Sequence, residues 1–170
     1  MTEGPRPRIL VGTTPEPSPH VVAEAARFAR RFEAELVFAW VDSSRYTTGL
    51  GPDGIFITLP LDPDAEGYEE PVVDPALKAS LSQLLADHPL PWSVRALAGS
   101  PAQELEYLAE EIEPEMIIVG TREAGVRGSL RELLSGSVAV HLAHHQDRSI
   151  VVVPLGDQRR GHEDSLPDPA

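Results

Sequence analysis

Short apolar runs recur along the chain and indicate strands that are buried on both faces, as in a parallel sheet. Each run is only a few residues long and is bounded by polar residues, Gly or Pro, which favours strands over helices. The run near residue 95 instead alternates apolar and polar positions, which is typical of a strand at a sheet edge. The pattern predicts strands at residues 8–12, 35–41, 92–98, 115–120 and 149–154.

Apolar residues spaced three and four positions apart predict helices between these strands. The first helix has Ser18 as its N-cap and Pro19 at its first position, and it runs to Phe32. Further helices are predicted at 75–87, from 101 onward and at 130–144. Strands that alternate with helices predict an α/β fold, in which right-handed crossovers place helices on both faces of a parallel sheet.

The segment 43–75 interrupts this alternation. It is rich in Pro, Gly and acidic residues, with no Lys or Arg after Arg45, and we predict a mostly irregular surface insertion with a small strand at 55–59. Residues 157–170 are polar and contain Pro, so we predict a disordered tail. Residues 1–156 are then expected to form a single domain, because a chain of 170 residues is too short for two ordinary domains.

Charge and composition narrow the class of protein. The chain has 27 acidic and 14 basic residues, a formal net charge of −13 at pH 7. A field of this sign repels phosphate backbones and anionic lipid, so we expect no nucleic-acid or membrane partner. The lack of cysteine excludes disulfide frameworks, thiol catalysis and cysteine zinc sites. No secretory signal or bilayer-spanning run is visible, and we expect a cytoplasmic protein.

Ligands of parallel α/β folds bind beyond the carboxyl ends of the strands, so the loops there form the expected site. The loop 121–129 stands out because it contains glycines and arginines, Arg127 among them, in an acidic protein. Two interpretations of these arginines remain open. They bind a small anion, or they pair with Glu123 and Glu132 on the surface.

Several motifs, in their order and spacing, resemble the universal stress protein family. They are RILVG at 8–12, ELVFAWVD at 35–42, AGSPAQEL at 98–105, EMIIVGT at 115–121, SGSVA at 135–139 and SIVVVP at 149–154. The resemblance implies a five-stranded parallel sheet of order 3-2-1-4-5 with helices on both faces, like that of the adenine-nucleotide alpha-hydrolases. It also implies a homodimer.

One branch of this family binds ATP through a G-x2-G-x9-G-[ST] pattern after the fourth strand, and another branch lacks the pattern. Glycines there let backbone N–H groups approach phosphates. This chain matches the pattern in part, because Gly120 and Gly136-Ser137 fit. However, Glu123 stands at the position of the second glycine, and the interval from Gly120 to Gly136 is longer than in the family pattern. Gly125 and Gly128 are the remaining candidates for that glycine.

The first loop also departs from the family, because Thr14 stands where the family usually has an Asp that contacts the nucleotide. Val41 matches the position whose backbone contacts adenine, although its side chain equally suits a buried strand. The resemblance implies a degenerate site for ATP, with Mg²⁺ if ATP is bound, or for another adenine nucleotide. The expected residues are Gly12, Thr13, Thr14, Val41, Gly120, Thr121, Gly125, Arg127, Gly128, Gly136, Ser137 and Val138.

His141, His144 and His145 lie on the last predicted helix at a spacing that can place two imidazoles on one metal ion. A histidine cluster near a helix C-terminus is also favoured by the helix dipole. Because no Cys is available, we interpret these residues as surface histidines and predict no metal site.

The chain contains no nucleophile-elbow or Walker motif, and its only lysine, Lys78, lies on a predicted helix. We therefore expect no enzyme, or at most slow ATP hydrolysis. The leading hypothesis is a regulatory protein of the universal stress type that binds an adenine nucleotide. The alternative is a nucleotide-free homodimeric interaction module that binds an unknown protein partner through the acidic insertion.

Overall fold

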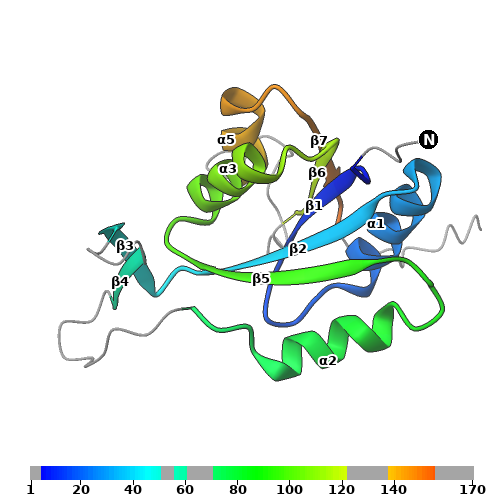
Figure 1. Ribbon diagram of the computed structural model, residues 1–170, viewed down its shortest axis with the longest axis horizontal. Coiled ribbons are helices and arrows are strands. Elements are labelled where there is room, and N and C mark those ends of the chain that lie inside the picture. Colours follow the sequence, from blue (N-terminus) through cyan, green and yellow to red (C-terminus); the bar gives the residue numbers. More distant parts are fainter. Residues whose placement is uncertain (1–4, 51–55, 61–70, 122–137, 156–170) are drawn as a thin grey trace, which may run out of the picture.

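A five-stranded parallel sheet forms the centre of the computed structural model, which describes residues 5–50, 56–60, 71–121 and 138–155, with the backbone alone described at 45–50 and 56–60. The strand order is β5-β2-β1-β6-β7 (Figure 1). Counted along the chain within this sheet, the order is 3-2-1-4-5, so the predicted fold and the predicted edge strand are confirmed. The strands are β1 (Arg8–Thr13), β2 (Glu35–Asp42), β5 (Trp92–Ala98), β6 (Met116–Gly120) and β7 (Ser149–Val153).

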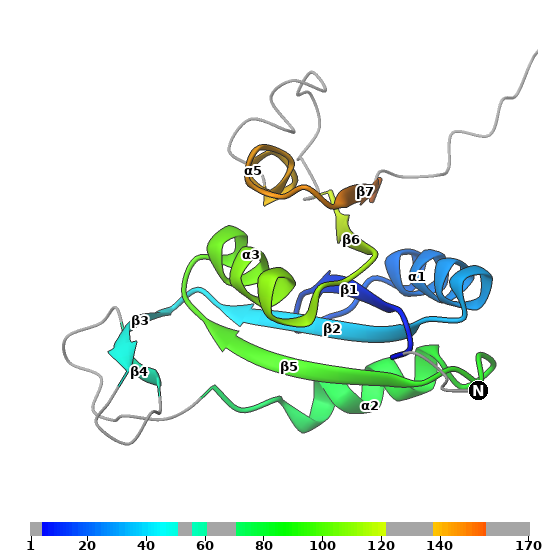
Figure 2. The ribbon, with the colours of Figure 1, turned by 45° about the horizontal axis from the view of Figure 1, so that its top comes forward.

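Helices cover both faces of the sheet (Figure 2). One face packs against α1 (Pro19–Phe32) and α2 (Pro75–Leu84), and the other against α3 (Pro101–Ile112) and α5 (Val138–His145). α2 ends at Leu84 and is therefore shorter than the predicted helix 75–87. The first part of the predicted helix 130–144 lies outside the described residues. No helix within the described ranges combines the length and the apolar character that a bilayer crossing needs.

The central strands are buried because successive residues face opposite helix layers. In β1, Ile9 and Val11 belong to the core beneath α1 and α2, whereas Leu10 between them belongs to the core beneath α3 and α5. All three side chains are fully buried. This two-sided burial is the physical reason why the central strands read as continuous apolar runs.

The helix ends only partly follow their predicted caps. Ser18 and Ser100 stand at the N-cap positions of α1 and α3, each followed by Pro, but neither side chain makes a capping hydrogen bond. Asp74 does cap α2, because its Oδ1 accepts a hydrogen bond from the backbone N–H of Ala76 at 2.8 Å. The sequence Asp-Pro therefore fixes the start of α2 more firmly than Ser-Pro fixes the other two starts.

The prediction of a mostly irregular segment at 43–75 is wrong for part of that segment. β3 (Arg45–Leu50) and β4 (Phe56–Pro60) pair as an antiparallel hairpin with an irregularity between Thr47 and Gly49. Figure 1 shows this hairpin projecting from the end of the sheet at which β2 ends. The sequence signalled only the second strand, because β3 has no run of apolar residues to reveal it.

Candidate functional site

The carboxyl ends of the five parallel strands lie along one edge of the sheet, which we call the carboxyl edge. Because α1 and α3 each follow a strand directly, both helices begin at this edge and present their first backbone N–H groups there. The described segments of the carboxyl edge are 13–18, 41–44, 98–101, 120–121 and 153–155. All the predicted site residues that are described, apart from Gly12 and Val138, lie in these segments.

The chain changes its direction of travel across the sheet between β1 and β6. From β1 it moves outward to β2 and β5, and it then crosses back to β6 and β7 on the other side of β1. The register of β1 with β6 ends at Val11 and Ile118. By contrast, β1 stays in register with β2 as far as Thr13, and β6 with β7 as far as Gly120. Doubly wound sheets bind their ligands at such a switch point.

Gly12 and Gly120 flank this switch point, and close packing explains why both positions lack a side chain. A Cβ on Gly12 would lie 3.2 Å from Leu105 Cδ1 and 3.3 Å from Val119 Cγ1. A Cβ on Gly120 would lie 3.1 Å from Leu155 Cδ1 and 3.2 Å from a Val21 methyl group. Both glycines therefore let a helix or a loop approach the strand ends closely.

The threonine hydroxyls predicted for the site already have partners within the protein. Thr14 Oγ1 donates to the backbone oxygen of Glu16 at 2.6 Å, and Thr13 Oγ1 donates to the backbone oxygen of Thr14 at 3.2 Å. Thr121 Oγ1 accepts a hydrogen bond from the backbone N–H of Leu155 at 2.8 Å, which ties the end of β6 to the end of β7. These bonds shape the loops, and each hydroxyl oxygen still has a lone pair for a ligand.

Val41 lies one residue beyond Trp40, which is the register partner of Thr13. The end of β2 therefore reaches slightly past the end of β1, next to the switch point. The following residue, Asp42, accepts hydrogen bonds through Oδ1 from the backbone N–H and the hydroxyl of Ser44. Its backbone oxygen accepts from Gly99 N–H at 3.1 Å, so the loops after β2 and β5 are joined.

The described segments of the carboxyl edge contain no Lys or Arg, and they contain the acids Glu16 and Asp42. A ligand phosphate would thus meet backbone N–H groups here rather than cationic side chains. Val138, the first residue of α5, is half-buried against the core beneath α3 and α5. The predicted site residues Gly125, Arg127, Gly128, Gly136 and Ser137, together with Glu123, lie outside the described residues.

One pair at the carboxyl edge was not predicted from the sequence. Gly99 has a φ of +138°, a backbone conformation that side-chain-bearing residues rarely adopt, and a Cβ there would lie 2.8 Å from Glu104 Oε1. Glu104 lies in the first turns of α3, and burial raises the pKa of its carboxyl group. The turn lies between β5 and α3. Its one signal in the sequence is Gly99, which stands between the predicted strand and the Ser-Pro pair that begins the helix.

A profile of the Universal stress protein family matches residues 5–154 of the chain. No curated protein sequence gave a match. Solved structures of similar fold include a universal stress protein in complex with cAMP, which is 20% identical with a TM-score of 0.58. That match covers 89% of this chain and 98% of the other.

Two further solved structures were determined with nucleotides. A universal stress protein from Archaeoglobus fulgidus in complex with dAMP is 13% identical, with a TM-score of 0.51 and coverage of 87% of this chain and 97% of that one. A universal stress protein family protein from Arabidopsis thaliana with AMP bound is 10% identical, with a TM-score of 0.51 and coverage of 92% and 97%. At such identities the likeness is one of fold.

Proposed function

The chain belongs to the universal stress protein family, and we propose that it is a regulatory protein that binds an adenine nucleotide at the carboxyl edge of its sheet. The observation that carries this proposal is the switch point between β1 and β6, where the strand register ends at Val11 and Ile118. The nucleotides in the cAMP, dAMP and AMP complexes of proteins with this fold support the choice of ligand class.

Each part of the nucleotide would meet a different strand end. The adenine ring would lie against the backbone at Val41, at the end of β2. The ribose would lie over the loop that begins at Thr13 and Thr14. The phosphate would face the end of β6 at Gly120 and the first residues of α5, where helix-terminal N–H groups attract an anion.

The two acids in the described segments of the carboxyl edge favour a ligand with few phosphates. Glu16 and Asp42 are the charged side chains in its described segments, and both repel a phosphate. A monophosphate such as AMP or cAMP carries less negative charge than ATP and meets less repulsion. We propose that Arg127 contacts the phosphate and offsets this repulsion in part. AMP or cAMP then binds more tightly than ATP, and Mg²⁺ improves ATP binding by neutralising part of its charge.

We propose that the protein acts by binding rather than by catalysis. Its only lysine, Lys78, lies on α2, a helix that covers the sheet and does not begin directly after one of its strands. The threonine hydroxyls at the edge have backbone partners and no neighbouring imidazole among the described contacts. A nucleotide that joins the loops after β1, β2 and β6 would instead change which loop conformations the protein populates.

Isothermal titration calorimetry on the full chain with AMP, cAMP, and ATP with and without Mg²⁺ tests this proposal. We expect a dissociation constant below about 1 mM for at least one nucleotide. Arg127→Ala should weaken binding by about tenfold or more, because a hydrogen bond to a charged group contributes about 1.5–3 kcal/mol. The matched control is Arg31→Ala, since Arg31 is exposed in the last turn of α1, far from the carboxyl edge. The lack of both heat and a thermal shift with all nucleotides at millimolar concentration would overturn the proposal.

A second candidate function is that of a nucleotide-free homodimer, and the position of β7 at the edge of the sheet, as far as the residues are described, favours it. β7 is the last strand of the sheet, and its Val152 side chain is 38% exposed although it is apolar. A second copy pairing with this strand would bury that side chain and satisfy the edge. Light scattering after gel filtration should then give twice the 18.4 kDa chain mass. Val152→Asp should shift the mass toward the monomer, and a monomeric wild-type protein would contradict this function.

A further inference from the structure

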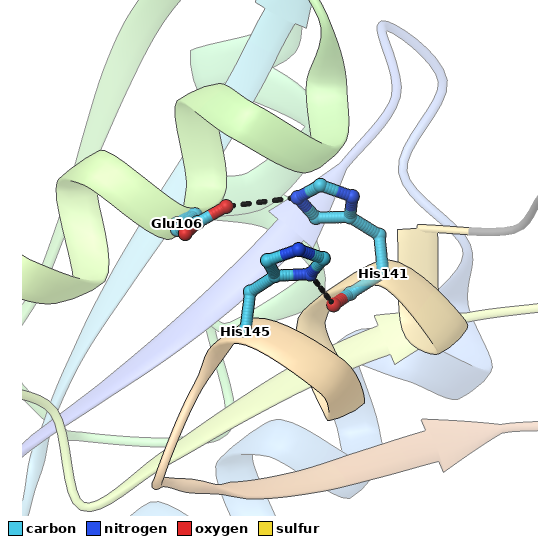
Figure 3. A group of neighbouring side chains, drawn as sticks. All are labelled: Glu106, His141 and His145. Carbon is cyan, nitrogen blue, oxygen red and sulfur yellow. Dashed lines mark hydrogen bonds and ion pairs between the residues drawn. The ribbon is translucent and has the colours of Figure 1, made fainter.

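A carboxylate and two imidazoles converge where α3 packs beside α5. Figure 3 shows Glu106 of α3 pointing toward His141 and His145, which stand one above the other on α5. His141 Nε2 lies 2.8 Å from Glu106 Oε2, and the two imidazole rings stack with their centroids 4.2 Å apart. One ligand atom from each of the three residues lies within 4.8 Å of the other two. The cluster therefore offers two nitrogen donors and one oxygen donor. The in-plane lone pairs of the two stacked rings run nearly parallel, so one ring must turn before both nitrogens face the same ion.

The hydrogen bond of His145 determines which of its nitrogens is free. His145 Nδ1 lies 2.9 Å from the backbone oxygen of His141. A carbonyl oxygen only accepts hydrogen bonds, so Nδ1 must carry the proton. In the neutral ring the lone pair then resides on Nε2. Metal-binding histidines are usually held in this way, with the second ring nitrogen donating to a backbone carbonyl or a carboxylate.

The contact between His141 and Glu106 has the length of an ordinary hydrogen bond. A neutral His141 donates from Nε2 to the carboxylate, and a metal ion can take the place of that proton between the two atoms. Glu106 and His141 are half-buried, with side-chain exposures of 20% and 30%, so their positions are set by the packing of α3 against α5. His145 is exposed, so its ring can turn out of its stack with His141.

We propose that Glu106, His141 and His145 form a binding site for a divalent transition-metal ion such as Zn²⁺. Ligand atoms around a tetrahedral Zn²⁺ lie about 2.0–2.2 Å from the metal, and hence about 3.3 Å from one another. The His141–Glu106 contact must widen by about half an ångström to reach this spacing, while the His145 ring must move inward. A water molecule would complete the tetrahedral shell as the fourth ligand.

The mixed donor set selects the class of metal. Mg²⁺ and Ca²⁺ prefer shells made of oxygen, whereas imidazole nitrogen suits Zn²⁺, Ni²⁺ and Cu²⁺. Three protein ligands with an open fourth position form a common zinc arrangement. The site joins two helices that are separated by β6 in the sequence, so metal binding would stabilise the folded chain.

The site is independent of the proposed nucleotide site. His141 and His145 lie in the middle and at the end of α5, and Glu106 lies in the middle of α3, whereas the carboxyl edge lies near the beginnings of these helices. A protein that fails to bind Zn²⁺ could therefore still bind a nucleotide. A protein that fails to bind a nucleotide could likewise still bind Zn²⁺.

Calorimetric titration of the nucleotide-free full chain with ZnCl₂ tests the proposal. We expect one strong site, and we expect His145→Ala and Glu106→Gln each to weaken Zn²⁺ binding by about tenfold or more. The matched control is His144→Ala, since His144 is an exposed histidine on the same helix that does not belong to the cluster. Circular dichroism before each titration checks that every variant is folded.

Two results would overturn the proposal. One is a loss of Zn²⁺ affinity in His144→Ala as large as that in His145→Ala. The other is a strong site that persists in the double variant His141→Ala/His145→Ala, because the ion would then be bound by other residues. Cobalt substitution adds a direct readout, since tetrahedral Co²⁺ bound by nitrogen and oxygen has visible absorption bands that should vanish in the double variant.

Discussion

His141 Nε2 contacts Glu106 Oε2 at 2.8 Å and thereby links α5 to α3 across 35 positions of the sequence. Both side chains are half-buried, so this hydrogen bond is less exposed to water than a surface ion pair. The exposed pair Arg95–Glu111 has nearly the same length, 2.7 Å, but its side chains are 46% and 62% exposed. The two contacts differ in burial and also in their donor, which is an imidazole in the first and an always charged guanidinium in the second.

A double-mutant cycle should separate these two pairs. With EDTA present, Glu106→Gln and His141→Ala should show a coupling free energy of about 0.5–1.5 kcal/mol in urea unfolding. The cycle for Arg95→Ala and Glu111→Gln should give about 0–0.5 kcal/mol, because exposed pairs contribute little. Equal coupling energies in the two cycles would contradict the expectation that the half-buried contact is the stronger of the two.

Gly99→Ala should destabilise the protein. The φ of +138° at this position strains any residue with a side chain, and the new methyl group would also crowd Glu104. We expect a loss of about 1–3 kcal/mol in the free energy of unfolding. Adding Glu104→Ala removes the crowding but not the strain, so most of the loss should remain. As a control, Ser100→Ala should cost less than about 0.5 kcal/mol, since its side chain makes no capping hydrogen bond.

Glu104 should make the protein less stable as the pH rises. Burial raises the pKa of its carboxyl group above the ordinary value of 4.5, so the folded chain holds this proton more tightly than the unfolded chain does. Unfolding then releases a proton in the range above pH 4.5, and the free energy of unfolding falls as the pH rises through that range. Glu104→Gln should remove this contribution. Urea unfolding at several pH values between 4.5 and 7.5 measures this effect. The free energy of unfolding should decline less with pH in the variant than in the wild type. An equal decline in both proteins would show that Glu104 does not cause it.

Gly120→Ala tests whether that glycine serves packing. The added methyl group would lie 3.1 Å from Leu155 Cδ1, which is tighter than most contacts of this kind, so Leu155 would have to shift. We expect a loss of about 1–3 kcal/mol in stability from overpacking. In a Leu155→Ala background the added methyl group meets less crowding. Gly120→Ala should therefore cost less stability in that background than in the wild-type protein. Full nucleotide affinity in the folded Gly120→Ala protein would show that the glycine is needed for packing alone.

The sequence predicted the parallel sheet because its central strands are buried on both faces. The strand β1 shows this in its apolar run Ile9, Leu10 and Val11, whose side chains are all fully buried. In a chain where strands and helices alternate, such a run indicates a strand covered by helices on both faces. The strand β3 escaped prediction since its residues, RYTTGL, show neither a run nor a regular alternation of apolar positions. A hairpin held by backbone pairing leaves only a weak pattern in the side chains.

The candidate site was predicted less completely, because its contacts join residues that are distant in the sequence. The spacing of His141 and His145 was visible, but their partner Glu106 is on another helix, and no sequence pattern connects them. The sequence predicted that Gly12 and Gly120 contact the ligand. In the structure, neighbouring side chains also pack closely against both glycines. Thr121 was expected at the site, and its hydroxyl bonds the backbone of Leu155.

Backbone NMR spectra recorded during titration with AMP test the central proposal, a nucleotide at the carboxyl edge, most directly. We predict that the largest amide shift changes occur at Thr13, Thr14, Asp42, Gly120 and Thr121, on the three strand ends around the switch point. Amides of α2, on the face covered by α1 and α2, should change little. The account would be contradicted by spectra that stay unchanged at millimolar AMP, or by shift changes that gather on α2 or at the amino ends of the strands.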